Sequence, residues 1–106
     1  MIITNLFDLP SVLLSEELTT LLAESKSSAN VRIERIVSTG QASDWYDQAE
    51  TEFVALLEGD AVLEFENGRT VALTKGDVLL ISPHERHRVS HTSSNPPCVW
   101  LCVFWK

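Results

Sequence analysis

The chain has 106 residues, of which 44% are hydrophobic and 22% charged, so it is long enough to bury one core and has the composition of a globular domain. Its formal net charge is −7, with eight Lys and Arg against fifteen Asp and Glu, which argues against a nucleic-acid partner and an anionic membrane surface. The N-terminus has no basic region and no long apolar run. We therefore expect neither a secretory signal nor a membrane span, and predict a cytoplasmic protein.

Residues 1–30 predict an N-terminal helical extension. Ser15 is a suitable N-cap, and Glu16 and Glu17 would lie in the first turn, near the positive end of the helix dipole. The positions i, i+4, i+7, i+8 and i+11 would share one face: Leu14, Leu18, Leu21, Leu22 and Ser25. We expect this short helix to pack on the outside of a sheet. A membrane-bound or partner-binding helix is the weaker alternative, because the polar face is acidic rather than basic.

Residues 31–106 change to short strands separated by turns. The predicted strands are Val31–Ser38, Thr51–Leu57, Ala61–Glu66, Arg69–Leu73, Val78–Ile81, His87–His91 and Val99–Trp105. Asn67-Gly68 between two alternating runs predicts a hairpin with a type I′ turn, because both residues tolerate a positive φ. Closely spaced short strands of this kind are typical of an all-β sandwich or barrel. We therefore expect a single domain over residues 1–106, with a β-barrel in residues 31–106.

The two cysteines, Cys98 and Cys102, lie four positions apart at the last predicted strand. At the rise of a strand they would be roughly 13 Å apart, which is too far for a disulfide bond. A metal site would need a turn and further Cys or His ligands. We therefore predict two buried, reduced, structural cysteines, in agreement with a reducing compartment.

Five residues between positions 40 and 59 have the spacing of a known metal-binding motif. Gly40 is followed after five residues by Tyr46, after one by Gln48, after three by Glu52 and after six by Gly59. This spacing resembles the first signature of the cupin family, which has histidines at the positions of Tyr46 and Gln48. The frame of the motif is therefore present, with altered chemistry at two of its positions.

A second run resembles the second cupin signature. Gly76-Asp77 opens it, His87 lies at the position of the family's histidine, and His91 lies where an asparagine is expected. Pro83 is displaced by one position. The chain is thus similar to small single-domain bacterial cupins with a degenerate first motif. The resemblance implies an all-β, jelly-roll barrel, here with a short N-terminal helix.

Strand alternation favours one shared site. Tyr46, Gln48 and Glu52 have the same parity, as do His87 and His91, so each set would point to one side of an extended segment. His84 has the opposite parity and is expected at the surface. His91 ends a predicted strand, so we expect it at the surface or the rim.

Carried over from the family, Glu52 and His87 match metal-ligand positions, and Gln48 and Tyr46 stand at the other two. The resemblance implies a divalent metal (Zn, Ni, Mn or Fe) held by Gln48, Glu52 and His87, with Tyr46 and His91 as weaker candidates. An amide oxygen and a phenol are poorer ligands than imidazole for Zn, Ni or Fe(II). Metal affinity is therefore expected to be much lower than at a site of three histidines and one glutamate.

Two functions are compatible with these residues. In the first, the barrel binds a small polar or carboxylate-bearing molecule, either with a divalent metal or through hydrogen bonds alone. The alternative is a metal-dependent isomerase or dioxygenase-type enzyme. There the metal on Glu52, His87 and Gln48 would polarise a substrate oxygen, and Tyr46 would donate a proton. The chain has no nucleophile elbow and no phosphate-binding glycine loop.

The last predicted strand suggests that the chain self-associates. The run Val99–Trp105 is apolar at both parities, so one of its faces needs cover beyond the barrel interior. Small cupins resemble one another in dimerising through their sheets. We therefore predict a homodimer, although the N-terminal helix would be a second way to cover this face.

Overall fold

The computed structural model describes residues 4–11 and 13–106, and these form an all-β protein. Its strands are β1 (Leu18–Ser25), β2 (Val31–Ser38), β3 (Thr51–Glu58), β4 (Asp60–Phe65), β5 (Thr70–Thr74), β6 (Val78–Ile81), β7 (His87–Thr92) and β8 (Cys98–Trp105). The part of the chain that the structure describes has no helix long and apolar enough to span a membrane.

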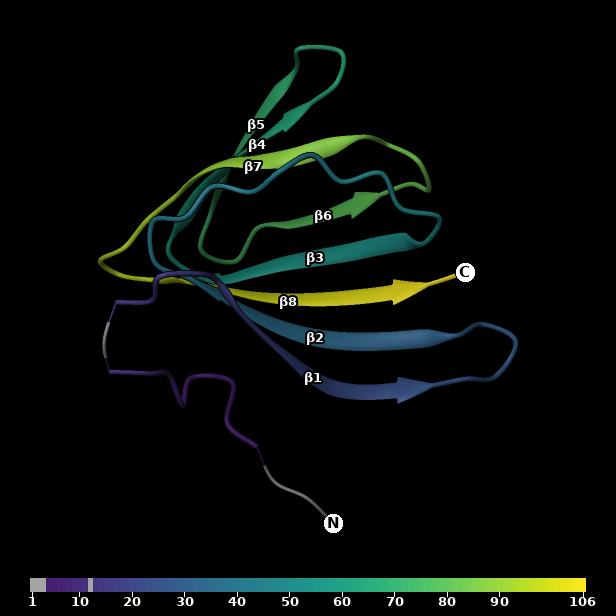
Figure 1. Ribbon diagram of the computed structural model, residues 1–106, viewed down its shortest axis with the longest axis horizontal. Helices are drawn as coiled ribbons and strands as arrows, with labels where there is room; N and C mark the ends of the chain where they lie inside the picture. Colours follow the sequence, from purple (N-terminus) through teal and green to yellow (C-terminus); the bar gives the residue numbers. More distant parts are fainter. Residues whose placement is uncertain (1–3, 12) are drawn as a thin grey trace.

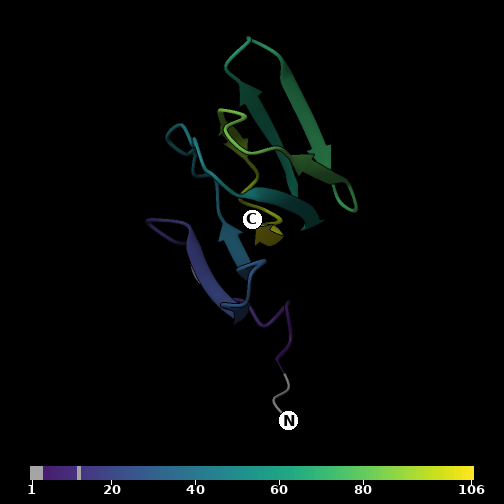
Figure 2. The same ribbon diagram turned by 90° about the vertical axis from the view of Figure 1, so that its right-hand side faces the viewer.

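Two antiparallel sheets enclose the core (Figure 1, Figure 2). The larger sheet has the strand order β1-β2-β8-β3-β6, and the smaller has the order β5-β4-β7. The buried core draws large side chains from both sheets: Leu56, Trp100 and Phe104 from the larger, and Leu63, Phe65 and Leu73 from the smaller. Burying each such side chain contributes roughly 1.5–3 kcal/mol, so this shared core holds the two sheets together.

The seven strands predicted in residues 31–106 are confirmed to within one residue at each end. Val31–Ser38 and Val78–Ile81 have the predicted bounds. The reason is local: each strand is either an alternating or a continuous apolar run bounded by turn residues, and both signals act within a few positions of the chain.

The predicted N-terminal helix is wrong. The residues assigned to it from position 18 onward form β1, which pairs with β2 from Leu18↔Val37 to Ser25↔Val31. A short isolated helix is marginal in water, whereas pairing with the edge of β2 satisfies the backbone polar groups on one side of this segment. The register shifts between Leu21 and Ala23, and Leu21 is 51% exposed, so the leucines do not form one buried stripe. Residues 1–3 and 12 of the predicted extension lie outside the described residues.

The hairpin between β4 and β5 is confirmed, but its predicted turn type is wrong. Gly68 has a φ of 84°, whereas Asn67 is not among the residues with positive φ. The Gly68 N–H donates to the Phe65 carbonyl at 2.9 Å, and the Phe65 N–H donates to the Arg69 carbonyl at 2.8 Å. This pattern matches a three-residue loop in which glycine takes the left-handed position. Only Gly68 therefore needs the conformational freedom of glycine.

We expect Gly68→Val to lower the free energy of unfolding by about 1–3 kcal/mol, since a β-branched residue is strained at positive φ. A Cβ at Gly68 would meet no atom within 4 Å, so the cost is purely one of backbone conformation. Gly68→Asn is the matched control and should cost less, because asparagine tolerates this conformation. Urea denaturation measures both variants, and equal stability of Gly68→Val and wild type would contradict the turn assignment.

Candidate functional site

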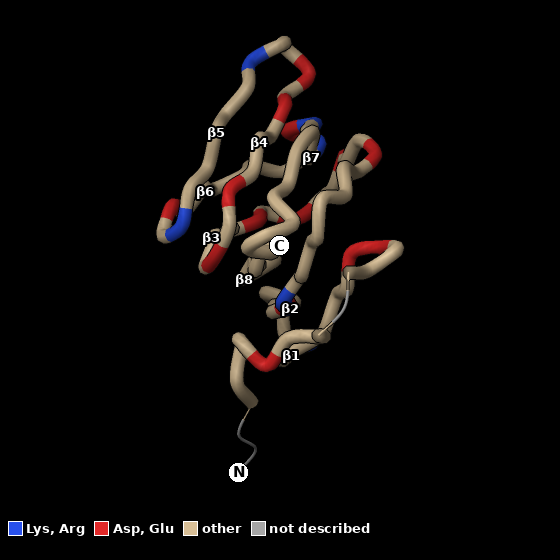
Figure 3. Tube along the Cα trace, turned by 90° about the vertical axis from the view of Figure 1, so that its left-hand side faces the viewer, with Lys and Arg blue, Asp and Glu red and all other residues tan. Residues whose placement is uncertain are grey.

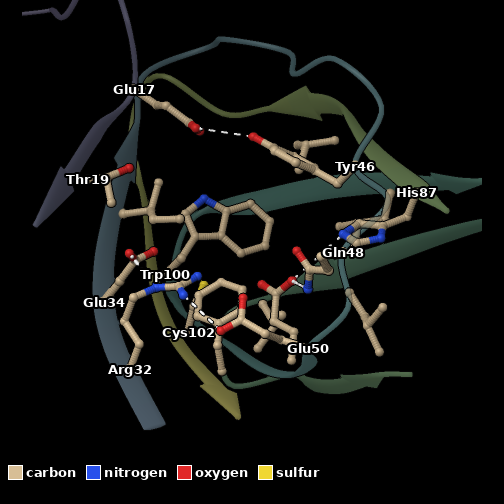
Figure 4. Close-up of a pocket in the computed structure, with 17 residues that line it drawn as sticks. Glu17, Thr19, Arg32, Glu34, Tyr46, Gln48, Glu50, His87, Trp100 and Cys102 are labelled. Carbon is tan, nitrogen blue, oxygen red and sulfur yellow. Dashed lines mark hydrogen bonds and ion pairs between the residues drawn. The ribbon is translucent and has the colours of Figure 1, made fainter. Parts of the chain in front are cut away.

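A cavity of about 400 Å³ lies between the two sheets. Its lining comes from every strand except β5, together with Glu17, just before β1, and the loop of residues 39–50 (Figure 4). The cavity size lies in the range of small-molecule sites. Side chains far apart in the sequence therefore meet in one enclosed space.

The polar centre of the cavity consists of Gln48, Glu52 and His87. The Gln48 amide Nε2 donates to Glu52 Oε1 at 2.9 Å, and His87 Nε2 lies 3.8 Å from the same oxygen. The side chains of His87 and Glu52 are only 5% and 10% exposed. The structure thus brings together the three residues that the sequence predicted as a site.

His87 is held in one orientation by its backbone and its ring. The backbone of Tyr46 bridges to that of His87, with the Tyr46 N–H donating to the His87 carbonyl at 2.7 Å. His87 Nδ1 lies 2.8 Å from the Glu85 carbonyl oxygen, which can only accept a hydrogen bond. Nδ1 therefore carries a proton, and in the neutral ring the lone pair of Nε2 faces Glu52.

The loop of residues 39–50 runs beside β7 and positions Tyr46 and Gln48. Besides the Tyr46–His87 bridge, the Ser43 N–H donates to the Val89 carbonyl at 2.8 Å. The carbonyl of Gln48 accepts from the His84 N–H at 2.7 Å. These backbone contacts, rather than a regular strand, place the two side chains on the wall of the cavity.

Tyr46 lies at the mouth of the cavity, 40% exposed, and its hydroxyl is 3.5 Å from Glu17 Oε1. Burial raises the pKa of Glu17, the hydrogen bond from Tyr46 opposes this, and the charge of Glu34 adds to it. Burial also raises the pKa of Tyr46, and the charge of Glu17 adds to the effect. Tyr46 is therefore a neutral hydrogen-bonding group at physiological pH.

His84 and His91 lie outside the polar centre. His84 is exposed, with Nδ1 2.7 Å from Asp47 Oδ1, and His91 Nε2 lies 3.6 Å from Asp60 Oδ2. The β4–β7 register shifts so that Val62 pairs with His91 and Leu63 with Val89. This bulge breaks the alternation that would have put His91 on the side of His87.

The model for the cupin domain matches residues 34–104, which is more than half of the chain. The chain belongs to the cupin family. A search of curated proteins finds no significant match.

Solved structures of other cupins resemble this one. A Ralstonia eutropha JMP134 protein, described as a candidate mannose-6-phosphate isomerase, is 38% identical with a TM-score of 0.90, covering 100% of this chain and 99% of its own. A cupin superfamily protein from Desulfitobacterium hafniense DCB-2 has 19% identity and a TM-score of 0.77, with coverage of 92% and 83%. KdgF from Halomonas sp. has 14% identity and a TM-score of 0.72, with coverage of 84% and 77%. The latter two likenesses concern the fold alone.

The donor set of this cupin does not fit a divalent transition-metal centre. Within residues 4–11 and 13–106, no group of three or more His, Cys, Asp and Glu side chains could hold a metal ion. Gln48 turns its NH₂ group, which cannot ligate a metal, toward Glu52, and the Tyr46 hydroxyl is directed to Glu17. One imidazole nitrogen and one carboxylate then remain, which is too few for the metals expected from the family.

Cys102 lies on the cavity wall and does not complete such a site. It is 2% exposed, and both cysteines are free and buried, as predicted. Burial, with a contribution from the charge of Glu52, raises the pKa of the Cys102 thiol. Among the described residues Cys102 belongs to no group of three or more His, Cys, Asp and Glu side chains that could hold a metal, so it is a neutral, packed side chain of the wall.

Sequence reasoning missed the acidic half of the cavity. Arg32 donates through Nε to Glu34 at 2.9 Å and through Nη1 to Glu50 at 2.8 Å, and all three line the cavity. Trp100 also lines it and donates through Nε1 to Ser38 Oγ at 3.2 Å. The available signal was the placement of Arg32 and Glu34 at alternate positions of one strand, which puts both side chains on the same face.

Replacing Glu52 by Gln should raise the melting temperature at neutral and alkaline pH. Burial raises the pKa of Glu52 above 4.5, against opposing contributions from Gln48 and His87. A carboxyl group whose pKa is higher in the folded than in the unfolded state stabilises the fold in its protonated form. This stabilisation is complete below the pKa of the unfolded state and is lost as the pH rises through the pKa of the folded state. The gap in melting temperature between Glu52→Gln and wild type should therefore widen from pH 4.5 to about pH 8.

The control for this prediction is Glu24→Gln, which removes one negative charge from an exposed strand position outside the cavity. Its melting temperature should follow that of wild type across the same pH range. If both variants behave alike, net charge rather than burial of Glu52 explains the effect.

Proposed function

We propose that this cupin is a metal-independent binding module that holds one small polar molecule in its barrel. The observation that carries the proposal is the 2.9 Å hydrogen bond from Gln48 Nε2 to Glu52 Oε1, which lies where the family places metal ligands. There the amide donates one hydrogen bond to the carboxylate in place of a metal ion, and it leaves the negative charge of Glu52 uncompensated. The same atoms can exchange this bond for bonds to a ligand.

The cavity offers a ligand a small number of aimed polar groups on an otherwise largely apolar wall. Glu52 can accept hydrogen bonds, Gln48 can donate and accept, and His87 Nε2 can accept through its lone pair. The Tyr46 hydroxyl at the mouth donates its one proton to Glu17, so its oxygen can accept a hydrogen bond from a ligand. Leu63, Ile81 and Phe104 provide apolar contact. Sites of this composition orient small molecules by a few hydrogen bonds.

The metal-dependent isomerase or dioxygenase is the less favoured function. It needs a metal on Glu52, His87 and Gln48, of which only Glu52 and His87 have side chains that transition metals prefer. The Ralstonia relative is named for a phosphate ester, but Arg32 is the one Lys or Arg on the described cavity wall, and Glu34 and Glu50 already occupy it. The carboxylate-bearing ligand expected from the sequence is disfavoured for the same reason.

The experiment has two parts. Elemental analysis of protein purified without chelator and without a nickel-affinity tag should find far less than one metal ion per chain. Binding of small polar compounds should then persist in EDTA, followed by the quenching of tryptophan fluorescence, because Trp100 lines the cavity. Stoichiometric metal, or binding that EDTA abolishes, would overturn the proposal.

The homodimer stays a prediction. Trp100, Cys102 and Phe104 face the cavity, so the alternate residues Leu101, Val103 and Trp105 lie on the outer face of the larger sheet. On β6, which β3 separates from β8 in the same sheet, Val78 and Leu80 are 58% and 59% exposed. A second copy would cover this apolar face. Light scattering at tens of micromolar should give twice the chain mass, and a strictly monomeric mass would remove the prediction.

A further inference from the structure

The charges on the cavity wall are strongly unbalanced. Four carboxylates line it (Glu17, Glu34, Glu50 and Glu52), and the wall has one guanidinium, that of Arg32. Glu34 and Glu50 share Arg32, at 2.9 and 2.8 Å. No Lys or Arg of the described residues forms an ion pair with Glu17 or Glu52, and the ionisable group paired with Glu52 is the imidazole of His87, at 3.8 Å. Two of the four carboxylates therefore lack a permanent cation.

Both of these carboxylates are substantially removed from water. The Glu52 side chain is 10% exposed, and the hydrogen bond from Gln48 reaches only its Oε1. Glu17 is half-buried and has the Tyr46 hydroxyl as its polar partner. Burial raises the pKa of each carboxyl. A buried carboxylate is stabilised by a nearby positive charge, so the wall favours a ligand that brings one.

Aromatic rings complete the same wall. Figure 4 shows the indole of Trp100 between the Glu17–Tyr46 pair and the group of Arg32, Glu34 and Glu50. The guanidinium carbon of Arg32 already stacks 4.1 Å from the centroid of Phe104, so this wall holds one organic cation over an aromatic face. Trp and Tyr faces flanked by carboxylates are the usual setting for binding an ammonium or guanidinium group.

The charge of the whole chain acts in the same direction. Basic positions are few and scattered in Figure 3, and the formal net charge is −7. Such a field attracts cations toward a cleft lined by acidic groups and repels anions.

We infer that the ligand of this cavity is a small organic cation, an amine or a quaternary ammonium compound, with its positive group between Glu17, Glu52 and the face of Trp100. This inference rests on the proposed function and specifies the chemical class of its ligand. Gln48 and His87, beside Glu52, then contact the remaining polar part of the same molecule. A phosphate ester or a dicarboxylate would face an excess of negative charge.

The test uses matched probes of one length and different charge: putrescine, butanediol and succinate. Calorimetric titration in EDTA at fixed ionic strength should give an affinity for putrescine at least about tenfold above that for butanediol, with succinate weakest. Choline should likewise exceed its uncharged carbon isostere, dimethylbutanol. Equal or tighter binding of butanediol or succinate would overturn the inference but leave the proposed function standing, since the cavity would still hold a small molecule. If none of the probes binds, both the inferred ligand class and the proposed function are contradicted.

Variants of two wall residues test whether the preference for a cation arises in the cavity. Glu17→Gln should weaken putrescine binding and improve that of succinate, whereas Glu24→Gln, with the same change in net charge outside the cavity, should change neither. Arg32→Gln frees Glu34 and Glu50 and should tighten putrescine binding. If Arg32 instead recognises an anionic ligand, this variant would lose succinate binding and leave putrescine unchanged, and the inference would be wrong.

Discussion

Gly59→Ala is expected to remove most of the stability of the fold. Gly59 joins β3 to β4 with a φ of 87°, and a Cβ there would lie 2.7 Å from Ser93 Oγ, 2.8 Å from the Pro97 carbonyl oxygen and 2.9 Å from Cys98 Cα. Two of these atoms belong to the backbone and cannot rotate away. Backbone strain and overpacking together would cost about 2–6 kcal/mol, comparable with the whole stability of many domains.

Gly76→Ala is the matched control, because Gly76 has a φ of 92° and a Cβ there would meet nothing within 4 Å. It should show the cost of the backbone conformation alone, about 1 kcal/mol. Urea denaturation of both variants separates the free-energy cost of the steric contacts at Gly59 from the cost of the backbone conformation. Equal losses at Gly59 and Gly76 would mean that the loop of residues 93–97 does not pack against Gly59.

The variant Gln48→His is expected to gain metal binding and, with it, a large increase in stability. Gln48→His replaces the amide that points its NH₂ group at Glu52 with an imidazole, and so assembles two histidines and one carboxylate. This set suits Fe(II) and other first-row divalent metals. At a metal concentration 100 times Kd the folded state would gain about 2.7 kcal/mol. For a chain of this size that corresponds to a rise in Tm of roughly 10–20 °C.

The double variant Gln48→His with His87→Ala should lose this gain, because only one histidine would remain. The same double variant with His91→Ala in place of His87→Ala should keep it, because His91 pairs with Asp60 on the surface. A gain that survives removal of His87 would place the metal elsewhere.

The strands were predictable because their signals are local, and the N-terminal segment was not. Leu14, Leu18, Leu21 and Leu22 have helical spacing, but from Leu18 onward the segment pairs as a hairpin with the next strand, β2. Tertiary pairing therefore overrode the local preference for a helix. The same pairing brings Glu17 to the cavity wall. Because we predicted a helix for this segment, we did not predict Glu17 as a residue of the site.

The polar centre was predictable and the charged wall was not. Gln48 and Glu52 follow from the spacing of the first motif, and His87 from that of the second. Arg32 and Glu34 reach the cavity because β2 pairs with β8 in the register Arg32↔Phe104 and Glu34↔Cys102. That register joins residues about seventy positions apart, and sequence periodicity does not specify it.

The central claim is that this cupin holds its ligand without a metal. Thermal melting of wild type with excess Zn, Ni, Mn or anaerobic Fe(II), beside Gln48→His under the same conditions, tests it most directly. We predict an unchanged Tm for wild type and a raised Tm for Gln48→His, which shows that the assay detects a metal in this barrel. A rise in the Tm of wild type that His87→Ala abolishes would contradict the account and restore the metal-dependent enzyme as the function to pursue.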